Sequence, residues 1–372
     1  MTDKKNSFLS FPPTVFVIGK YYEILLFAEQ NGIFWVEVNG ERYYPENAGT
    51  LASERPFAKV RLPQTVLNES KLYRVCYRKT VDRKAYFAQL GGILSEDHDF
   101  RPLTKTCDIR MYHIADVHYA FEVGIKTASF FGDDLDMLIV NGDVGEVETE
   151  ENYKEVARFT GEIAKGGLPV LFVRGNHDTR GHLAEKYTDY FPAEGKNTYY
   201  SFEEGPLCGV AMDCGEDKHD THPEYGGDGG LCTGVNAFEP FRRRETDFLR
   251  GLKLPEGKIP FAACHICPVQ TTRNPGDEFD IEHDVYTAWN AELERLGIRF
   301  MLSAHTHHAY ILTPDDPDSI LPHNYPVIVG SSTFPHKTDL VGAAIILNPD
   351  GAEVLFTNAS HEVRKKISLT FD

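Results

Sequence analysis

Side chains that bind metal ions recur in order along the last two thirds of this 372-residue chain. They form short clusters of carboxylate, amide and imidazole groups, namely Asp116 with His118, Asp143, Asn176, His265, and His305 with His307. Oxygen and nitrogen ligands gathered from several loops are what a site for two metal ions requires. Such a pair of ions activates a water molecule for attack on phosphorus. The clusters therefore predict chemistry on a phosphate ester.

Each cluster follows an apolar run that predicts a β-strand. The runs cover residues 109–114, 137–140, 170–173, 259–263 and 300–302. Predicted helices over 120–131 and 151–165 separate the first three runs, and this alternation indicates βαβ units in a largely parallel sheet. Further short strands at 210–212, 326–329 and 343–347 indicate a second sheet. We therefore expect the clusters at the carboxyl ends of the strands.

The order and types of these residues resemble those of the calcineurin-like metallophosphoesterases. That family has the motifs Asp-x-His, Gly-Asp-x-x-Asp/Glu, Gly-Asn-His-Asp/Glu, a lone His and Gly-His-x-His. Residues 142–146, Gly-Asp-Val-Gly-Glu, carry the second motif in full. Ala304 departs from the pattern, because the family usually has glycine there; its methyl group would crowd the turn but removes no ligand. The resemblance covers about residues 107 to 345.

The resemblance implies an α/β domain of two packed mixed sheets flanked by helices, with two metal ions at the sheet edge. The ligand sets that it implies are Asp116, His118, Asp143 and His307 for one ion and Asp143, Asn176, His265 and His305 for the other. This mixed donor set suits Mn, Fe or Zn better than Ca or Mg, which prefer oxygen ligands. Purple acid phosphatases have an iron-binding tyrosine where this chain has Glu146, so a tyrosinate–iron site is not expected.

The expected reaction is attack on phosphorus by a hydroxide that bridges the two ions, while the ions neutralise charge on the phosphoryl oxygens. The leaving alkoxide needs a proton. His177 follows Asn176 but is outside the implied ligand sets, so it is the candidate general acid. Glu146, the second acidic residue of its motif, would orient His177. Asp178 is predicted to cap the helix that follows it.

Three residues are candidates for binding the substrate. Arg180 has a planar fork that suits a phosphate group, and a surface ion pair is an equally good interpretation of it. The segment 215–234 is rich in Gly, Asp and His, and long loops of this kind are commonly functional. We interpret it as a specificity loop in which His219 and Tyr225 help to select the ester. The alternative is an inert surface excursion.

The first hundred residues have a different pattern. Short runs rich in Val, Tyr, Phe and Trp occur at 14–17, 22–28, 33–38, 58–62, 72–78 and 85–90. With Asn-Gly turn signals at 31–32 and 39–40, they predict an all-β sandwich of fibronectin or immunoglobulin type. We expect this accessory domain to span 1–104 and the catalytic domain 105–372, with a linker at 94–105. Packing support is the favoured role of the sandwich, and binding of a partner or a sugar is the alternative.

The net charge of −18 argues against a nucleic-acid polymer as substrate, since a protein that grips such a backbone presents a basic surface. The triplet Arg242–Arg244 is predicted to lie on the solvated face of a helix over 239–250. A small phosphorylated substrate is therefore favoured. Three functions follow: a phosphomonoesterase, which we favour; a phosphodiesterase for cyclic nucleotides or glycerophosphodiesters; and a metal-binding scaffold without catalysis.

The location of the protein is also an expectation. The polar N-terminus, residues 1–7, lacks the apolar core of a secretory signal. No apolar stretch reaches the roughly 20 residues that span a membrane. The seven cysteines are scattered and odd in number, as in proteins of a reducing compartment. We expect a cytoplasmic protein without membrane contact, and the pattern identifies no protein partner.

Overall fold

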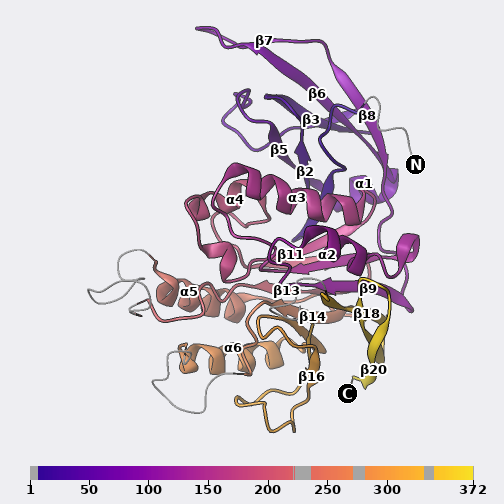
Figure 1. Ribbon diagram of the computed structural model, residues 1–372, viewed down its shortest axis with the longest axis vertical. Coiled ribbons are helices and arrows are strands. Elements are labelled where there is room, and N and C mark those ends of the chain that lie inside the picture. Colours follow the sequence, from indigo (N-terminus) through magenta and orange to yellow (C-terminus); the bar gives the residue numbers. More distant parts are fainter. Residues whose placement is uncertain (1–6, 221, 223–235, 271–280, 331–338, 372) are drawn as a thin grey trace.

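The computed structural model describes residues 7–220, 222, 236–270, 281–330 and 339–371. It has an N-terminal antiparallel β-sheet module and two larger mixed sheets flanked by helices (Figure 1). The strands of the nine-stranded sheet, in spatial order, are β20 (Val363–Thr370), β19 (Gly351–Asn358), β18 (Val341–Asn348), β9 (Ile109–Ile114), β10 (Met137–Asn141), β11 (Pro169–Val173), β1 (Thr14–Ile18), β2 (Tyr21–Phe27) and β5 (Phe57–Pro63). Those of the six-stranded sheet are β12 (Tyr200–Glu204), β13 (Leu207–Met212), β14 (Ile259–Cys264), β15 (Phe300–Ser303), β17 (Val327–Val329) and β16 (Tyr310–Leu312).

The strands that precede the ligand clusters are parallel neighbours within each sheet. Strands β9, β10 and β11 run parallel in the larger sheet, and β13, β14, β15 and β17 run parallel in the smaller one. All five strands predicted before a cluster are confirmed within one residue of their predicted ends. Because parallel strands present their carboxyl ends at one edge, the loops that follow them are brought together.

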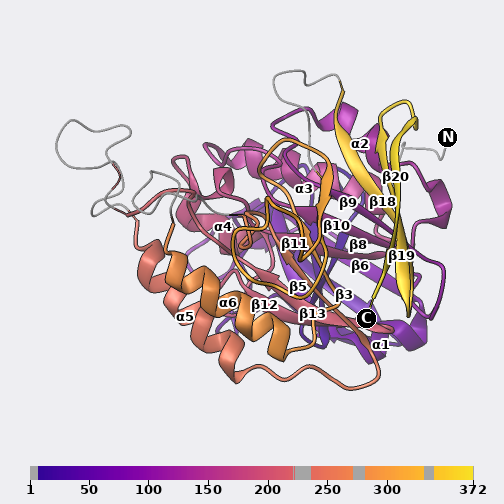
Figure 2. The same cartoon turned by 90° about the horizontal axis from the view of Figure 1, so that it is seen from below.

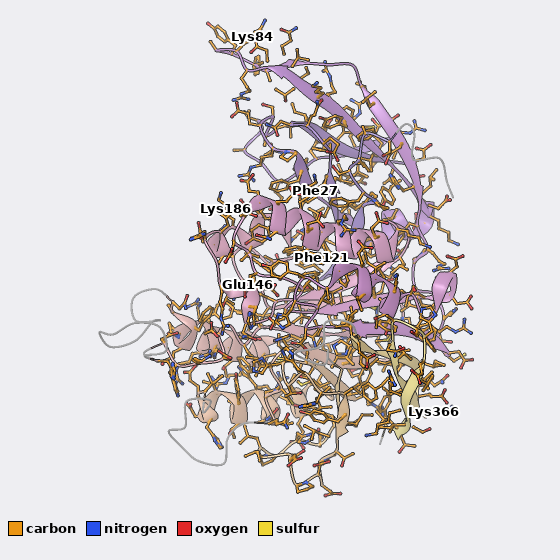
Figure 3. The ribbon with its side chains drawn as sticks, viewed as in Figure 1. Phe27, Lys84, Phe121, Glu146, Lys186 and Lys366 are labelled. Carbon is orange, nitrogen blue, oxygen red and sulfur yellow. The ribbon has the colours of Figure 1, made fainter. Side chains whose placement is uncertain are left out.

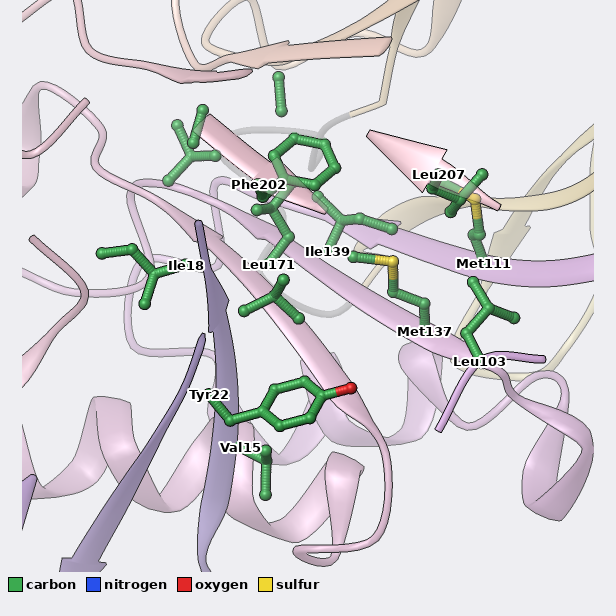
Figure 4. Close-up of a cluster of buried hydrophobic side chains, with 14 of the residues drawn as sticks. Val15, Ile18, Tyr22, Leu103, Met111, Met137, Ile139, Leu171, Phe202 and Leu207 are labelled. Carbon is green, nitrogen blue, oxygen red and sulfur yellow. The ribbon is translucent and has the colours of Figure 1, made fainter. Parts of the chain in front are cut away.

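The alternation of side chains along these strands explains why both faces of each sheet are apolar. Met111, Ile139 and Leu171 point into the core between the two sheets, whereas their sequence neighbours Tyr112 and Leu138 pack in the helix-side core. From the smaller sheet, side chains of β12 and β13 enter the same intersheet core (Figure 4). The two sheets therefore form one packed unit.

Helices close the outer faces of this pair of sheets. Helices α2 (Phe121–Ala128) and α3 (Glu150–Ala164) cover the larger sheet. Helices α5 (Phe238–Gly251) and α6 (His283–Arg295) pack side by side over the smaller sheet (Figure 2). The start of α3 is held by a capping box, in which the Thr149 side chain accepts from the Asn152 backbone N–H and Asn152 reciprocates. No helix in the described part of the chain combines the length and apolar character needed to cross a membrane.

The N-terminal module is antiparallel, as predicted, but it shares strands with the larger sheet. Its own strands are β4 (Glu41–Tyr43), β3 (Gly32–Val38), β6 (Leu72–Asp82), β7 (Gln89–Leu90) and β8 (Leu94–Asp99), and helix α1 (Gln64–Ser70) precedes β6. The predicted core residues Trp35, Val36, Tyr73 and Val75 are buried. Strand β1, however, pairs in parallel with β11, and β2 and β5 follow it in the nine-stranded sheet. Strands on both sides of the predicted boundary at 104/105 are therefore hydrogen-bonded to one another. Whether the two parts fold independently stays a prediction.

Two local predictions in this region are wrong. Most of the run 85–90 is not a strand, and only Gln89–Leu90 pair with β6. The predicted linker begins with a strand, β8, although its sequence is strongly charged. Strand β8 pairs with β6 in antiparallel orientation, and the paired residues Asp97 and Arg74 form an ion pair with a distance of 2.7 Å between Oδ1 and Nε. A charged sequence is compatible with this strand because most of its side chains face solvent.

The prediction for the arginine triplet is wrong at one of its three positions. Arg243 and Arg244 are exposed, but Arg242 is completely buried. Its guanidinium donates to the Cys214 carbonyl at 2.7 Å and to Glu282 at 3.2 Å. Helix α5 therefore directs a cation inward, where carbonyl groups and a carboxylate satisfy its donors.

A buried carboxyl group joins the N-terminal module to the smaller sheet. Glu204, at the end of β12, accepts hydrogen bonds from the Tyr22 hydroxyl at 2.7 Å and from the Leu103 backbone N–H at 3.1 Å. Burial outweighs these bonds and raises the pKa of Glu204 to about 7 from the ordinary value of 4.5. The folded protein therefore binds this proton more tightly than the unfolded chain does.

We expect Glu204→Gln to remove a pH dependence of stability. Below pH 4.5, Glu204 is protonated in both the folded and the unfolded protein, and its contribution to stability is fully present. As the pH rises from 4.5 through about 7, this contribution is lost, so the free energy of unfolding of the wild type falls over that window. The fall is about 3 kcal/mol in order of magnitude. Urea unfolding of wild type and variant between pH 5 and 8 measures the difference. Parallel stability curves for the two proteins would contradict the assignment.

Candidate metal centre

The two Gly-containing motifs meet at a contact that admits no side chain. A Cβ at Gly175 would lie 2.1 Å from the Asp143 carboxylate oxygen Oδ1 and 2.6 Å from the Asp143 nitrogen. Gly142 has a φ of 80°, and a Cβ there would lie 2.5 Å from the Gly175 Cα and 2.7 Å from His265 Nδ1. The glycines let the loops after β10 and β11 touch, and this contact brings the Asp143 and Asn176 loops together.

Most of the implied ligands have a left-handed backbone, which is uncommon for residues with a Cβ. Those with φ between 43° and 71° are Asp116, His118, Asp143, His305 and His307. Each such residue costs on the order of 1 kcal/mol or more, and strain of this kind concentrates at functional sites. Ala304 is outside the left-handed region, which explains how alanine replaces the usual glycine at that position.

All seven implied ligands meet at the edge shared by the two sheets. The donor atoms of Asp116, His118 and His307 lie within 4.8 Å of one another, and so do those of Asp143, His265 and His305. The Asn176 amide oxygen lies 3.0 Å from His305 Nδ1. Within the first group, His118 Nε2 and His307 Nε2 are 3.4 Å apart, and within the second, Asp143 Oδ2 lies 3.2 Å from His265 Nε2.

Backbone and carbonyl contacts orient these side chains. His265 donates from Nδ1 to the Asn141 carbonyl at 2.6 Å, which leaves Nε2 directed at Asp143. The Asn141 side chain in turn donates to Nε2 of buried His113 at 3.0 Å. A histidine held through one ring nitrogen presents the other as a metal ligand. The sequence analysis did not predict this role of Asn141, although a polar residue at the end of an apolar strand could have indicated that it lies at the site.

The buried carboxylates Asp116 and Asp143 lie close together at this centre, and a nearby proton or cation balances their negative charge. Burial alone would lower the pKa of His265, but the charges of Asp143 and Asp116 outweigh it and raise the pKa to about 10. Burial also favours the neutral form of Asp143, yet His265 and the nearby histidines hold the pKa of that carboxyl well below its usual range. Burial and the charge of His265 lower the pKa of His305 to about 4, which keeps that imidazole neutral and able to bind a metal ion.

The donor set fits a metal pair. Asp143 Oδ2 and His265 Nε2 are both buried and face each other at 3.2 Å, close enough for an ion pair when His265 is protonated. When that proton is absent, both atoms can bind a metal ion, because a carboxylate and a neutral imidazole are metal ligands. Carboxylate, amide and imidazole groups are ligands of Mn, Fe and Zn. The His and Asp clusters are thus consistent with a binuclear metal site.

His177 lies at the rim of this centre. Its Nδ1 is 3.3 Å from Glu146 Oε1, which agrees with the predicted orienting contact. Its ring is 4.9 Å from that of His118, and its donor atom also falls within 4.8 Å of those of His118 and Asp143. The position therefore allows either a proton donor or a metal ligand. Figure 3 places Glu146 near the level where the helix-covered larger sheet meets the layer of α5.

Asp178 does not cap a helix, so that part of its prediction is wrong, although its contacts are structural. It lies inside a short 3₁₀ turn, His177–Thr179, and its Oδ2 accepts from the Gly175 N–H at 2.8 Å and the Asp143 N–H at 3.1 Å. Burial and the Asp143 charge raise the pKa of Asp178 to about 7. Asp178 therefore fastens the two Gly-containing loops to each other.

The three residues predicted to bind the substrate differ in where the structure places them. Arg180 lies beside His177, with Nη1 3.4 Å from Nε2, but its fork is engaged by Glu216 at 2.7 and 2.5 Å. His219 faces Glu239 at the start of α5, with Nδ1 3.7 Å from Oε1, and is absent from the described clusters of metal-binding groups. Tyr225 lies outside the described residues, as does most of the predicted specificity loop.

We expect Gly175→Ala to weaken metal binding at least tenfold and to lower stability by about 2 kcal/mol, since overpacking of this contact forces Asp143 to move. Metal titration calorimetry and thermal unfolding measure both effects. Gly251→Ala is the matched control, because a Cβ at Gly251 meets nothing within 4 Å. Unchanged metal affinity in Gly175→Ala would show that the contact does not position Asp143.

Comparisons with known proteins agree with this geometry. Purple acid phosphatase PPD1 from yellow lupin (Lupinus luteus) is 11% identical and superposes with a TM-score of 0.63, covering 97% of this chain and 74% of that one. PhoD is 10% identical, with a TM-score of 0.57 and coverage of 98% and 90%. These likenesses show the fold. No curated protein sequence is significantly similar to the chain. The family model for calcineurin-like phosphoesterases matches residues 109–309, more than half of the chain, and the protein therefore belongs to that family.

Proposed function

We propose that the protein hydrolyses a small phosphate ester with two bound metal ions, and that phosphate monoesters are its preferred substrates. The observation that carries the proposal is the convergence of seven ligands from two sheets beside His177, a histidine with an acidic partner. A scaffold that only binds metal would need that histidine only as a further ligand. The acidic chain, with a net charge of −18, favours a small substrate over a polyanion.

The residues divide into those that hold the ions and those that handle the proton. Asp116, His118 and His307 would hold one ion, Asn176, His265 and His305 the other, with Asp143 between them. When bound, such ions supply Lewis-acid stabilisation of the phosphoryl oxygens and lower the pKa of water. We assign His177 the role of proton donor to the leaving oxygen, and Glu146, whose Oε1 lies 3.3 Å from Nδ1, would hold the ring. A hollow of the described residues adjoins His177, and the leaving alcohol of a monoester would occupy it.

A panel of metals and model substrates tests the proposal. Chelated protein is reloaded with Mn, Fe, Zn or Mg and assayed with p-nitrophenyl phosphate and bis(p-nitrophenyl) phosphate. We expect restored turnover with at least one transition metal and a higher kcat/KM for the monoester. A higher kcat/KM for the diester would overturn the monoester preference. Absence of turnover with every metal would leave the scaffold function in its place.

A further inference from the structure

A hollow of about 690 Å³ extends from His177 away from the implied ligands. Its charged lining residues are Glu146, Glu148, Glu185, Glu216, Arg174 and Arg180. An ester whose phosphoryl group sits at the ligand cluster must direct its alcohol part past His177, because the proton donor has to reach the bond that breaks. The hollow is therefore placed to receive the leaving alcohol.

The two arginines of the hollow are already neutralised by carboxylates. Arg180 is bound by Glu216 through two hydrogen bonds and by Asp217 at 3.0 Å. Arg174 donates to the buried carboxylate of Asp213 at 2.7 Å, and its guanidinium stacks against the rings of Tyr187, Phe238 and Phe241. Because each arginine is already ion-paired with a carboxylate, its attraction for a further anion is reduced.

The other charges of the hollow are negative. Glu148 and Glu185 are exposed and form no ion pair with any residue that the structure describes. Glu146 shares its charge with His177 at 3.3 Å. A neighbouring hollow shares Arg174 and Glu185 with this one and also contains Lys196 and Arg244, but neither of these two cations nor His177 lines both hollows. The alcohol part of a substrate thus meets carboxylates first.

We propose that the enzyme prefers phosphate esters whose leaving alcohol bears a positive charge, as in an amino alcohol. Glu148 and Glu185 attract the ammonium group, and the same two residues disfavour alcohols with a carboxylate or a further phosphate. The inference rests on the proposed function, because it assumes that the phosphoryl group is held by the metal ligands. It assigns specificity to two glutamates that lie outside the family motifs.

Three esters of similar size separate the charge of the alcohol from its shape. They are phosphoethanolamine, 2-hydroxyethyl phosphate and phosphoglycolate, whose alcohol parts are cationic, neutral and anionic. We expect kcat/KM of the metal-reloaded protein to fall in that order, with about a tenfold span between the first and the last. The span should shrink at high salt, since both glutamates are exposed. Calorimetric binding of the same esters gives the order independently of turnover.

The double variant Glu148→Gln with Glu185→Gln should reduce the span to about threefold or less. Glu69→Gln in α1 removes one exposed carboxylate of the same type in the N-terminal module and should keep the wild-type span. Turnover with equal or reversed preference, or a span that the double variant leaves intact, would overturn the inference while the proposed function stands. Binding in the expected order without any turnover would support the inference and overturn the proposed function.

Discussion

Replacement of Asp143 by Asn is expected to lower kcat/KM by about three orders of magnitude, because Asp143 would hold both ions of the proposed pair, which would contribute several kcal/mol to stabilising the transition state. Asp143 is the residue whose donor atoms join the clusters: it faces His265 at 3.2 Å and belongs to groups with both His118 and His305. Asn retains an oxygen that can accept the His177 backbone N–H, which Asp143 Oδ1 accepts at 2.9 Å. The change therefore removes charge and keeps shape.

Metal content per chain and kcat/KM together decide the outcome for this variant. We expect Asp143→Asn to retain less than one ion per chain after gel filtration, because a neutral amide cannot bridge two cations. Asp133→Asn changes an exposed carboxylate of the same type and should retain wild-type metal content. Two firmly bound ions and wild-type activity in Asp143→Asn would refute the bridging role.

Much of the site could be predicted because its information is local in the chain. The strands before the ligands are short apolar runs, and the polar residue that ends each run marks the carboxyl end of a strand. Strands β9, β10 and β11 were found in this way, and their parallel order followed from the helices between them. The ligand sets themselves came from the resemblance to the family motifs, which are also local in the chain.

The parts that could not be predicted depend on pairing between distant segments. Strand β1 reads as part of an antiparallel module, yet it completes the larger sheet beside β11, more than 150 residues later in the chain. The buried position of Arg242 depends on carbonyl groups of a loop nearly 30 residues earlier. The packed loops likewise impose the left-handed backbone of Asp116, His118 and Asp143, since residues with a Cβ seldom adopt it without such packing.

The engagement of Arg180 shows the same limit at the substrate side. Its sequence position beside the Gly-Asn-His motif indicates a phosphate-binding role or a surface ion pair with equal weight. Glu216, which binds its fork, comes from the loop after β13 and carries no motif of its own. Only the folded arrangement shows that one terminal nitrogen of Arg180 stays directed at His177 while the rest of the fork is occupied.

His177→Asn is expected to separate proton donation from metal binding. For an alkyl phosphate, whose leaving oxygen needs a proton, kcat should fall by about 10²–10⁴-fold. For p-nitrophenyl phosphate, whose leaving group departs as a stable anion, the fall should be about tenfold or less. The amide of Asn can still reach toward Glu146, which lies 3.3 Å from Nδ1 of the native ring. Steady-state kinetics on both esters, with metal content measured on the same sample, give the comparison.

The metal content decides between the two roles that the geometry allows for His177, since its donor atom lies within 4.8 Å of those of His118 and Asp143. A general acid predicts full metal content with a leaving-group-dependent loss. A ligand predicts loss of metal and an equal loss on both esters. His361→Asn controls for the substitution itself, because His361 is exposed and has a φ of 59°, a conformation that Asn tolerates. Equal losses on both esters with the metal retained would also reject the general acid, because a proton donor must matter more to the poorer leaving group.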